Sequence, residues 1–139
     1  MMASTSRPIQ FLTLPRVGVL LTLGIVLTYL PAMQGDFVWD DVFLIRDNPD
    51  LKSFETTWKI AWGDYYQQGD GERTQGGYLR PIPILLNGLT IQAFGPDPVA
   101  FHIGNLLLHC LAVWLALLVL VRRGIQLGVA AWIAGFYAF

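Results

Sequence analysis

One stretch constrains this chain more than any other: the 23 residues of Val99–Val121 carry no formal charge. A transmembrane α-helix needs about 20 consecutive, predominantly apolar residues to cross the hydrocarbon core of a bilayer. Arg122 and Arg123 end the apolar run. The stretch therefore predicts a complete membrane span.

A second apolar run, Val17–Met33, has 17 residues, which is near the lower limit for a spanning helix. Pro31 marks where that helix would end, because proline cannot continue a helix. A cleaved signal peptide is the alternative interpretation. Since Ala32 and the two residues after it are a poor small-x-small cleavage site, we expect an uncleaved anchor.

Two shorter runs complete the apolar pattern. Pro81–Phe94 has 14 residues and predicts a buried, interfacial or re-entrant helix rather than a span. Ile125–Phe139 has 15 residues, and we expect it to start a third transmembrane helix that the end of the chain truncates. The predicted fold class is an all-α, multi-span membrane protein with two full transmembrane helices, a truncated third, and a large outer loop containing short interfacial helices.

The charged residues are unevenly distributed. All ten acidic residues lie between Asp36 and Asp97, and the net charge is −1 without a basic patch, which argues against a nucleic-acid partner. The arginines outside that window, which the positive-inside rule places in the cytoplasm, are Arg7, Arg16, Arg122 and Arg123. The predicted segments are a cytoplasmic N-terminus (1–16), a first span (17–33), an extracytoplasmic loop (34–98), a second span (99–121), a cytoplasmic turn (122–124) and the start of a third span (125–139). The membrane would be a bacterial inner membrane or its equivalent.

The loop contains an aromatic pattern. Phe54, Trp58 and Trp62 recur at every fourth position, which places their rings along one side of a short helix. Ser53 stands where an N-cap belongs. One interpretation is a helix at the level of the lipid headgroups, where tryptophan is enriched; the alternative is a helix packed on the core of the loop itself. We favour the first because membrane spans flank the loop.

Three polar residues share one side of the second predicted span. His102, Asn105 and His109 follow at i, i+3 and i+7 and fall within an arc of about 60°. Because unpartnered polar groups are costly in a membrane, this side faces protein or a wet cavity rather than lipid. The residues either line a site beneath the outer loop or hydrogen-bond neighbouring helices, and their spacing does not decide between the two.

Arg80 precedes the apolar helix that starts at Pro81. A guanidinium at a membrane surface binds a phosphate through two parallel hydrogen bonds, or extends to lipid headgroups. From the residues alone, the lipid contact is the simpler interpretation.

Asp40 and Asp41 lie seven residues past the first predicted span, behind Phe37 and Trp39. Adjacent side chains diverge in a helix or a strand, so we expect only one of the two to act in a site. A carboxylate in a partly apolar setting has a raised pKa and is suited to act as a general base. An exposed acidic loop is the alternative.

These residues form an ordered pattern. It consists of Phe37-Val38-Trp39-Asp40-Asp41, Asn48, Tyr78-x-Arg80-Pro81, Asn87, Gly95 and Phe101-His102-x-x-Asn105-x-Leu107-x-His109. The pattern resembles the membrane-embedded glycosyltransferases of the GT-C superfamily, and most closely the branch that joins a multi-span O-mannosyltransferase-like domain to tetratricopeptide repeats. The resemblance covers the chain from about residue 17 to its end.

The resemblance implies an enzyme that moves a mannose-like sugar from a polyprenyl-phosphate donor to a hydroxyl of a protein or glycan acceptor, often Ser or Thr. It implies a catalytic carboxylate at Asp40 or Asp41, and donor-binding roles for Arg80, His102, Asn105 and His109. No metal ligands are assigned, although some branches bind a divalent metal through such acids. The chain has no repeats and few spans, so we expect an N-terminal portion that is inactive by itself. A non-catalytic membrane scaffold that binds a partner through its outer loop is the alternative, and a piece of a transporter is a more remote one.

Overall fold

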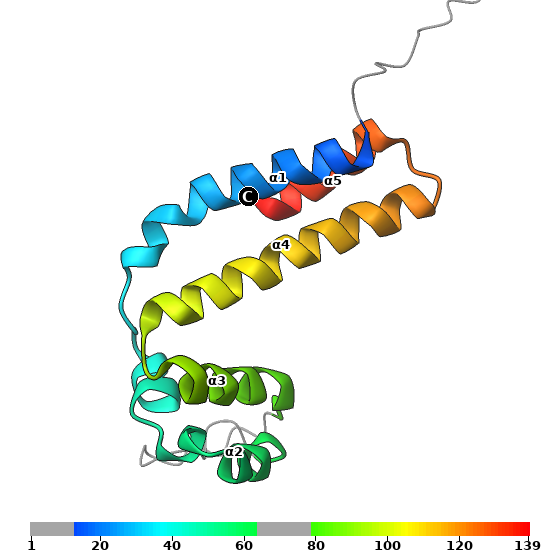
Figure 1. Ribbon diagram of the computed structural model, residues 1–139. Coiled ribbons are helices and arrows are strands. Elements are labelled where there is room, and N and C mark those ends of the chain that lie inside the picture. Colours follow the sequence, from blue (N-terminus) through cyan, green and yellow to red (C-terminus); the bar gives the residue numbers. More distant parts are fainter. Residues whose placement is uncertain (1–12, 64–78) are drawn as a thin grey trace, which may run out of the picture. The chain divides into compact units, whose positions relative to one another are not determined.

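The computed structural model describes residues 13–63 and 79–139, and within these ranges every regular element is a helix (Figure 1). The all-α prediction is therefore confirmed for the described residues. The first twelve residues of the predicted cytoplasmic segment, with Arg7, and residues 64–78 of the loop, with Tyr78, lie outside them. The chain divides into two compact units: unit 1 comprises Met1–Pro31 and Gly104–Phe139, and unit 2 comprises Ala32–Ile103.

Unit 1 contains the two long apolar helices that the sequence predicts. Helix α1 (Leu14–Tyr29) continues into a 3₁₀ turn, η1 (Leu30–Gln34), and together they form a 21-residue segment. Helix α4 (Pro98–Arg122) has 25 residues. Both are long and apolar enough to cross a membrane. Helix α5 (Leu127–Ala138) has 12 residues and is shorter than a span.

Helices α1 and α4 pack antiparallel. The Trp114 indole N–H donates to the Thr22 hydroxyl at 2.9 Å, and the Tyr29 ring lies edge-on to His109, with centroids 5.7 Å apart. Higher residue numbers in α1 thus pair with lower numbers in α4, so the end of α1 and the start of α4 lie at the same end of unit 1. Both chain connections to unit 2 leave from that end.

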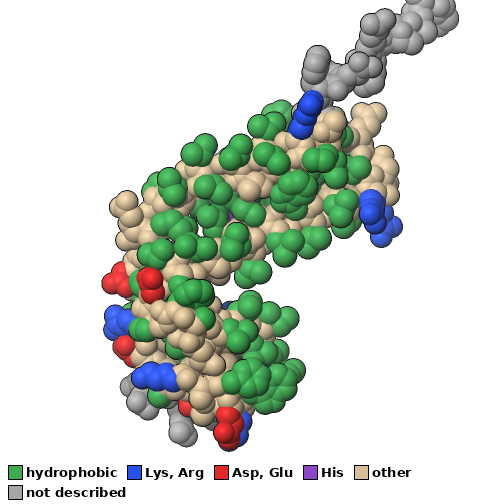
Figure 2. Space-filling view, in the orientation of Figure 1, with side chains coloured by type: hydrophobic (Ala, Val, Ile, Leu, Met, Phe, Trp, Pro, Cys, Tyr) green, Lys and Arg blue, Asp and Glu red, His purple; other side chains and the backbone are tan. Residues whose placement is uncertain are grey.

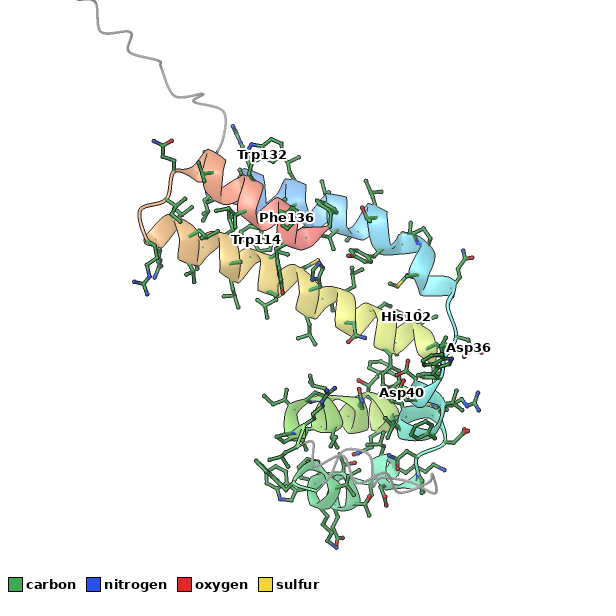
Figure 3. The ribbon with its side chains drawn as sticks, turned by 180° about the vertical axis from the view of Figure 1, so that it is seen from behind. Asp36, Asp40, His102, Trp114, Trp132 and Phe136 are labelled. Carbon is green, nitrogen blue, oxygen red and sulfur yellow. The ribbon has the colours of Figure 1, made fainter. Side chains whose placement is uncertain are left out.

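Small and aliphatic side chains form the core of unit 1. Its buried members are Val17, Ile25, Val113, Leu117, Ala130, Ala134 and Ala138. The three alanines recur at every fourth position, so α5 presents a narrow edge that lets it pack closely on α1. The outward side chains are large and apolar, including Trp132 and Phe136, which are 83% and 93% exposed (Figure 3). A surface of this kind suits a lipid environment.

Gly18 offers a test of this packing. A Cβ at position 18 would overlap the Trp114 ring, which the hydrogen bond to Thr22 holds in place. We expect Gly18→Ala to destabilise the folded chain by about 1–3 kcal/mol through overpacking, measured by thermal unfolding in detergent micelles. Gly104→Ala is the matched control, because a Cβ there meets no atom within 4 Å. Equal stabilities of the two variants would contradict the α1–α4 contact.

Unit 2 is built from short elements around its own core. These are a π-helical turn η2 (Val42–Arg46), a 3₁₀ turn η3 (Pro49–Lys52), helix α2 (Phe54–Ala61), helix α3 (Pro81–Phe94) and the first turns of α4. The Ser53 hydroxyl accepts a hydrogen bond from the Thr56 backbone N–H at 3.2 Å, so the predicted N-cap is present. The core of this unit comprises Leu44, Ile45, Leu51, Ala61, Ile84 and Ile91.

Helix α2 and helix α3 approach closely because Gly88 leaves space for Thr57. The buried Thr57 hydroxyl donates to the Ser53 carbonyl at 2.7 Å. The Gln92 side-chain amide donates to the Leu51 carbonyl at 3.1 Å and to the Thr57 hydroxyl at 3.3 Å. The buried polar groups at this contact are thereby hydrogen-bonded, and unit 2 has a fixed frame on which the acidic motif is held.

Candidate functional site

The acidic pair lies on a tight turn that starts unit 2's first helical segment. Trp39 has φ = 55°, in the left-handed region that a bulky side chain rarely adopts. The turn is closed by hydrogen bonds from the Asp41 N–H to the Val38 carbonyl and from the Val42 N–H to the Trp39 carbonyl, both 3.2 Å. Asp40 and Asp41 are both exposed on this turn. Backbone strain of this kind is concentrated at functional sites.

The π-helical turn η2 follows the pair directly. The Asp47 N–H donates to the Val42 carbonyl at 2.9 Å, five residues back, and this wide turn directs Leu44 and Ile45 into the core. Asn48 closes it, because its amide donates to the Leu44 carbonyl at 3.0 Å and its carbonyl accepts from the Asp50 N–H at 2.9 Å. Single π turns of this type are frequent at functional sites.

The start of α4 packs against the acidic turn. The rings of Phe37 and Phe101 meet edge-to-face, with centroids 5.4 Å apart. His102 Nε2 lies 3.0 Å from the Gly35 carbonyl oxygen. Since a carbonyl only accepts, Nε2 carries the proton, and Nδ1 is the remaining ring nitrogen. Two residues on α4 thus hold the segment that leads to Asp40 and Asp41, and Figure 3 shows Asp36, Asp40 and His102 at the same end of unit 2.

The environment distinguishes the two acids. Although Asp41 is largely exposed, partial desolvation by the surrounding turn and, second, the neighbouring charge of Asp40 raise its pKa above the usual range. A hydrogen bond with the Val38 backbone and the charge of His102 act in the opposite direction but do not cancel the shift. Asp41 is therefore the carboxylate of the pair that is better suited to take up a proton.

The other predicted site residues are distributed over both units. Arg80 lies at the N-terminal end of the 14-residue α3, and His102 follows its C-terminal end. A helix of that length spans about 21 Å, so Arg80 is about 20 Å from the turn that leads to His102. Asn105 and His109 belong to unit 1.

His109 makes contacts between helices of unit 1. Its Nε2 lies 3.1 Å from the Ala138 carbonyl oxygen of α5, and its ring centroid lies 5.8 Å from that of Tyr137. The ring of His109 also contacts Tyr29 of α1. These contacts match the alternative in which His109 joins neighbouring helices. Asn105 is exposed. The donor-binding roles of Asn105, His109 and Arg80 stay predictions.

Three features of the site do not follow from the sequence. Asn48 belongs to the ordered pattern, but its burial and its two hydrogen bonds depend on the π turn. Nothing in the sequence around Gly35 predicts that its carbonyl oxygen contacts His102. The left-handed Trp39 has none, since a β-turn normally places glycine or asparagine at such a position.

The carboxylates of Asp40 and Asp41 are the oxygen donors that a divalent cation such as Mg²⁺ prefers. Across residues 13–63 and 79–139, no three His, Cys, Asp or Glu side chains come together in a way that would hold a metal ion. Any metal at this site would thus need ligands in addition to these two acids.

Known proteins resemble the chain over most of its length. Mouse protein O-mannosyl-transferase TMTC1 is 34% identical over 110 residues, which are 78% of this chain and 12% of the mouse protein. The human protein of the same name is 38% identical over 86 residues, covering 61% of this chain and 10% of the human one. The chain belongs to a protein O-mannosyltransferase-like family. The predicted O-mannosyltransferase-like family is therefore confirmed, while the GT-C superfamily and the tetratricopeptide repeats stay predictions.

More distant relatives agree with this family. Drosophila melanogaster protein O-mannosyl-transferase Tmtc1 is 31% identical over 91 residues, covering 66% of this chain and 11% of that protein. The chain thus spans about a tenth of the length of the curated relatives it matches. No family model and no solved structure matches it. Kinship with these transferases and two helices of spanning length indicate a membrane protein.

Proposed function

We propose that this chain is the N-terminal portion of an integral-membrane glycosyltransferase that moves a mannose-like sugar from a polyprenyl-phosphate donor to a Ser or Thr hydroxyl of a protein. The observation that carries the proposal is the acidic turn, where a carboxylate with a raised pKa is held beside a histidine in a chain related to protein O-mannosyl-transferases. The names of the relatives disfavour the alternative of a non-catalytic scaffold.

Asp41 is the proposed general base. An acceptor hydroxyl that attacks the anomeric carbon must lose its proton as the new bond forms, and a carboxylate within hydrogen-bond reach removes it. Asp40 tunes the pKa of Asp41 through its charge, and His102 counteracts that effect. The departing lipid phosphate needs a cation to stabilise its charge, a role that a divalent metal would fill.

The proposed site faces the extracytoplasmic side. Because α1 and α4 are antiparallel, Arg16 near the start of α1 lies at the same end of unit 1 as Arg122 and Arg123 at the end of α4. Figure 2 shows Lys or Arg side chains in blue at that end. The positive-inside rule assigns that end to the cytoplasm. The connections to unit 2 leave from the other end, which supports an outer position for the acidic turn.

A transfer assay tests the function directly. Membranes containing the full-length protein, of which we propose this chain to be the N-terminal portion, would receive polyprenyl-phosphate mannose labelled in the sugar, together with a Ser/Thr-containing acceptor protein. We expect label in the acceptor that alkaline β-elimination releases, because O-linked sugars on Ser and Thr are lost in this way. A parallel reaction with a chelator determines whether a divalent metal takes part. Transfer from a nucleotide sugar alone, or no transfer above membranes lacking the protein, would overturn the proposal.

The two neighbours of Asp41 should shift its titration in opposite directions. Asp40→Asn removes a charge that raises the pKa of Asp41, so the acid limb of the pH–rate profile should move to lower pH. His102→Asn removes a charge that lowers this pKa, so the acid limb should move to higher pH. The measurement is the rate of transfer against pH for both variants. A uniform loss of rate with an unmoved acid limb would mean that these residues act only on the fold.

A further inference from the structure

Helix α2 has three distinct faces. Thr57 and Ala61 are buried against the rest of unit 2. Phe54, Trp58 and Trp62, which we term the aromatic stripe, are 57%, 48% and 56% exposed. With steps of about 100° per residue, the stripe covers an arc of about 80° beside the buried face. Helix α2 thus packs on the core of unit 2 through Thr57 and Ala61 while the aromatic stripe stays outside that core.

The rings of the stripe form one continuous surface. Phe54 and Trp58 stack, with centroids 6.1 Å apart and planes at 26°, and Trp58 and Trp62 meet edge-on at 5.8 Å and 72°. The rings therefore support one another while their outer faces stay uncovered by the described residues of unit 2. Contiguous exposed apolar surface of this kind often marks an interaction site for protein or membrane.

Charged residues border the stripe on its other side. Lys59 and Glu55 pair across one helical turn at 2.7 Å, and their side chains are 68% and 78% exposed. Around α2, the order of faces is thus buried side chains, aromatic rings and exposed charges. This order matches the boundary of a bilayer, where tryptophan rings lie at headgroup depth and charged groups remain in water.

The connections of unit 2 supply the second argument. Unit 2 is inserted between α1 and α4, and both connections leave unit 1 from one end. If these two helices span a bilayer, unit 2 is tethered twice to the same face of it. The two tethers then keep unit 2, and α2 with it, close to a lipid surface.

We propose that the aromatic stripe inserts into the headgroup region of the bilayer that contains α1 and α4, with Glu55 and Lys59 facing water. The aromatic stripe thereby anchors unit 2 to the membrane surface. The proposal is independent of glycosyl transfer, since it assigns the stripe a lipid partner whatever reaction the acidic turn performs.

Spin-label accessibility tests the depth of the stripe. Phe54→Cys, in a Cys110→Ser background that removes the only native cysteine, places a nitroxide on the stripe while keeping both tryptophans. Lys59→Cys in the same background is the matched control on the charged face of the same helix. The full chain would be reconstituted in phosphatidylcholine nanodiscs, and power saturation would be measured with oxygen, which concentrates in lipid, and with a nickel chelate, which remains in water.

We expect the logarithm of the oxygen-to-nickel accessibility ratio to be positive at position 54 and negative at position 59. A negative value at both positions would place the stripe in water and overturn the proposal. Low accessibility to both reagents at position 54 would show that protein covers the stripe, which also overturns it. Quenching of tryptophan fluorescence by brominated lipid provides a check on the chain without a spin label. The reference is the double variant Trp58→Phe/Trp62→Phe, which lacks both tryptophans of the stripe. Equal quenching in the two proteins would likewise contradict insertion.

Discussion

Asp41→Asn is expected to lower the rate of mannosyl transfer by about 10²–10⁴-fold, the usual contribution of a general base. Asparagine keeps the shape of the side chain but cannot accept the acceptor's proton at neutral pH. The measurement is transfer from polyprenyl-phosphate mannose in membranes that contain equal amounts of the full-length protein with and without the substitution. Asp36→Asn is the matched control, since Asp36 is an exposed acid on the same segment whose Oδ1 only accepts a hydrogen bond from the Phe37 N–H.

The stability of Asp41→Asn separates catalysis from folding. The pKa of Asp41 is raised in the folded chain, so the folded state holds its proton more tightly than the unfolded state does. The fold therefore loses stability as the pH rises through the interval between the ordinary and the raised pKa. At neutral pH, Asp41→Asn removes a charge that the fold disfavours, so its melting temperature should equal or exceed that of the wild type.

Asp40→Asn decides which acid is the base. If Asp41 takes the proton, Asp40→Asn retains transfer at neutral pH and only moves the acid limb to lower pH. A loss in Asp40→Asn as large as that in Asp41→Asn would show that both carboxylates contact the reacting groups. Normal turnover in Asp41→Asn would refute its assignment as the base.

The helices of this protein follow from local sequence features. The apolar runs around Ile25 and Val113 are long enough to predict α1 and α4, because apolar length is the main determinant of a spanning helix. The Ser53 cap and the spacing of the aromatic stripe likewise fix α2 and its faces before any tertiary contact is considered. Each of these features depends on residues within a few turns of one another.

The site depends on contacts that local patterns do not contain. His102 and His109 share one side of a continuous helix, yet one contacts Gly35 in unit 2 and the other contacts Ala138 in unit 1. Helical spacing shows that two residues share one face of a helix. It does not show which residue of another element each of them contacts. Trp39 has a left-handed backbone two residues after Phe37, whose ring packs on Phe101 of α4. Nothing in the preferences of tryptophan predicts that conformation.

Asn48→Ala is expected to destabilise unit 2 by about 2–4 kcal/mol. The Asn48 side chain is buried and bonds the Leu44 carbonyl and the Asp50 N–H. Alanine leaves both groups without that partner, and an unsatisfied buried polar group costs about 1–3 kcal/mol. Because Asn48 closes the π turn that follows Asp41, local opening should expose Leu44 and Ile45. Hydrogen exchange of residues 42–50 in detergent micelles measures this effect together with the midpoint of unfolding.

Asn48→Asp is the matched variant, because it separates the hydrogen bond that Asn48 accepts from the one that it donates. Its carboxylate still accepts from the Asp50 N–H but cannot donate to the Leu44 carbonyl, and burial adds a cost for the charge. Stability should therefore fall at neutral pH and recover in part as the pH decreases, because a protonated carboxyl regains a donor. Asn105→Ala, at an exposed asparagine of unit 1, should leave exchange in residues 42–50 unchanged. If Asn48→Ala protects the π turn from hydrogen exchange as well as the wild type does, the prediction is wrong. The core contacts of Leu44 and Ile45 would then be enough to hold the turn that follows the acidic pair.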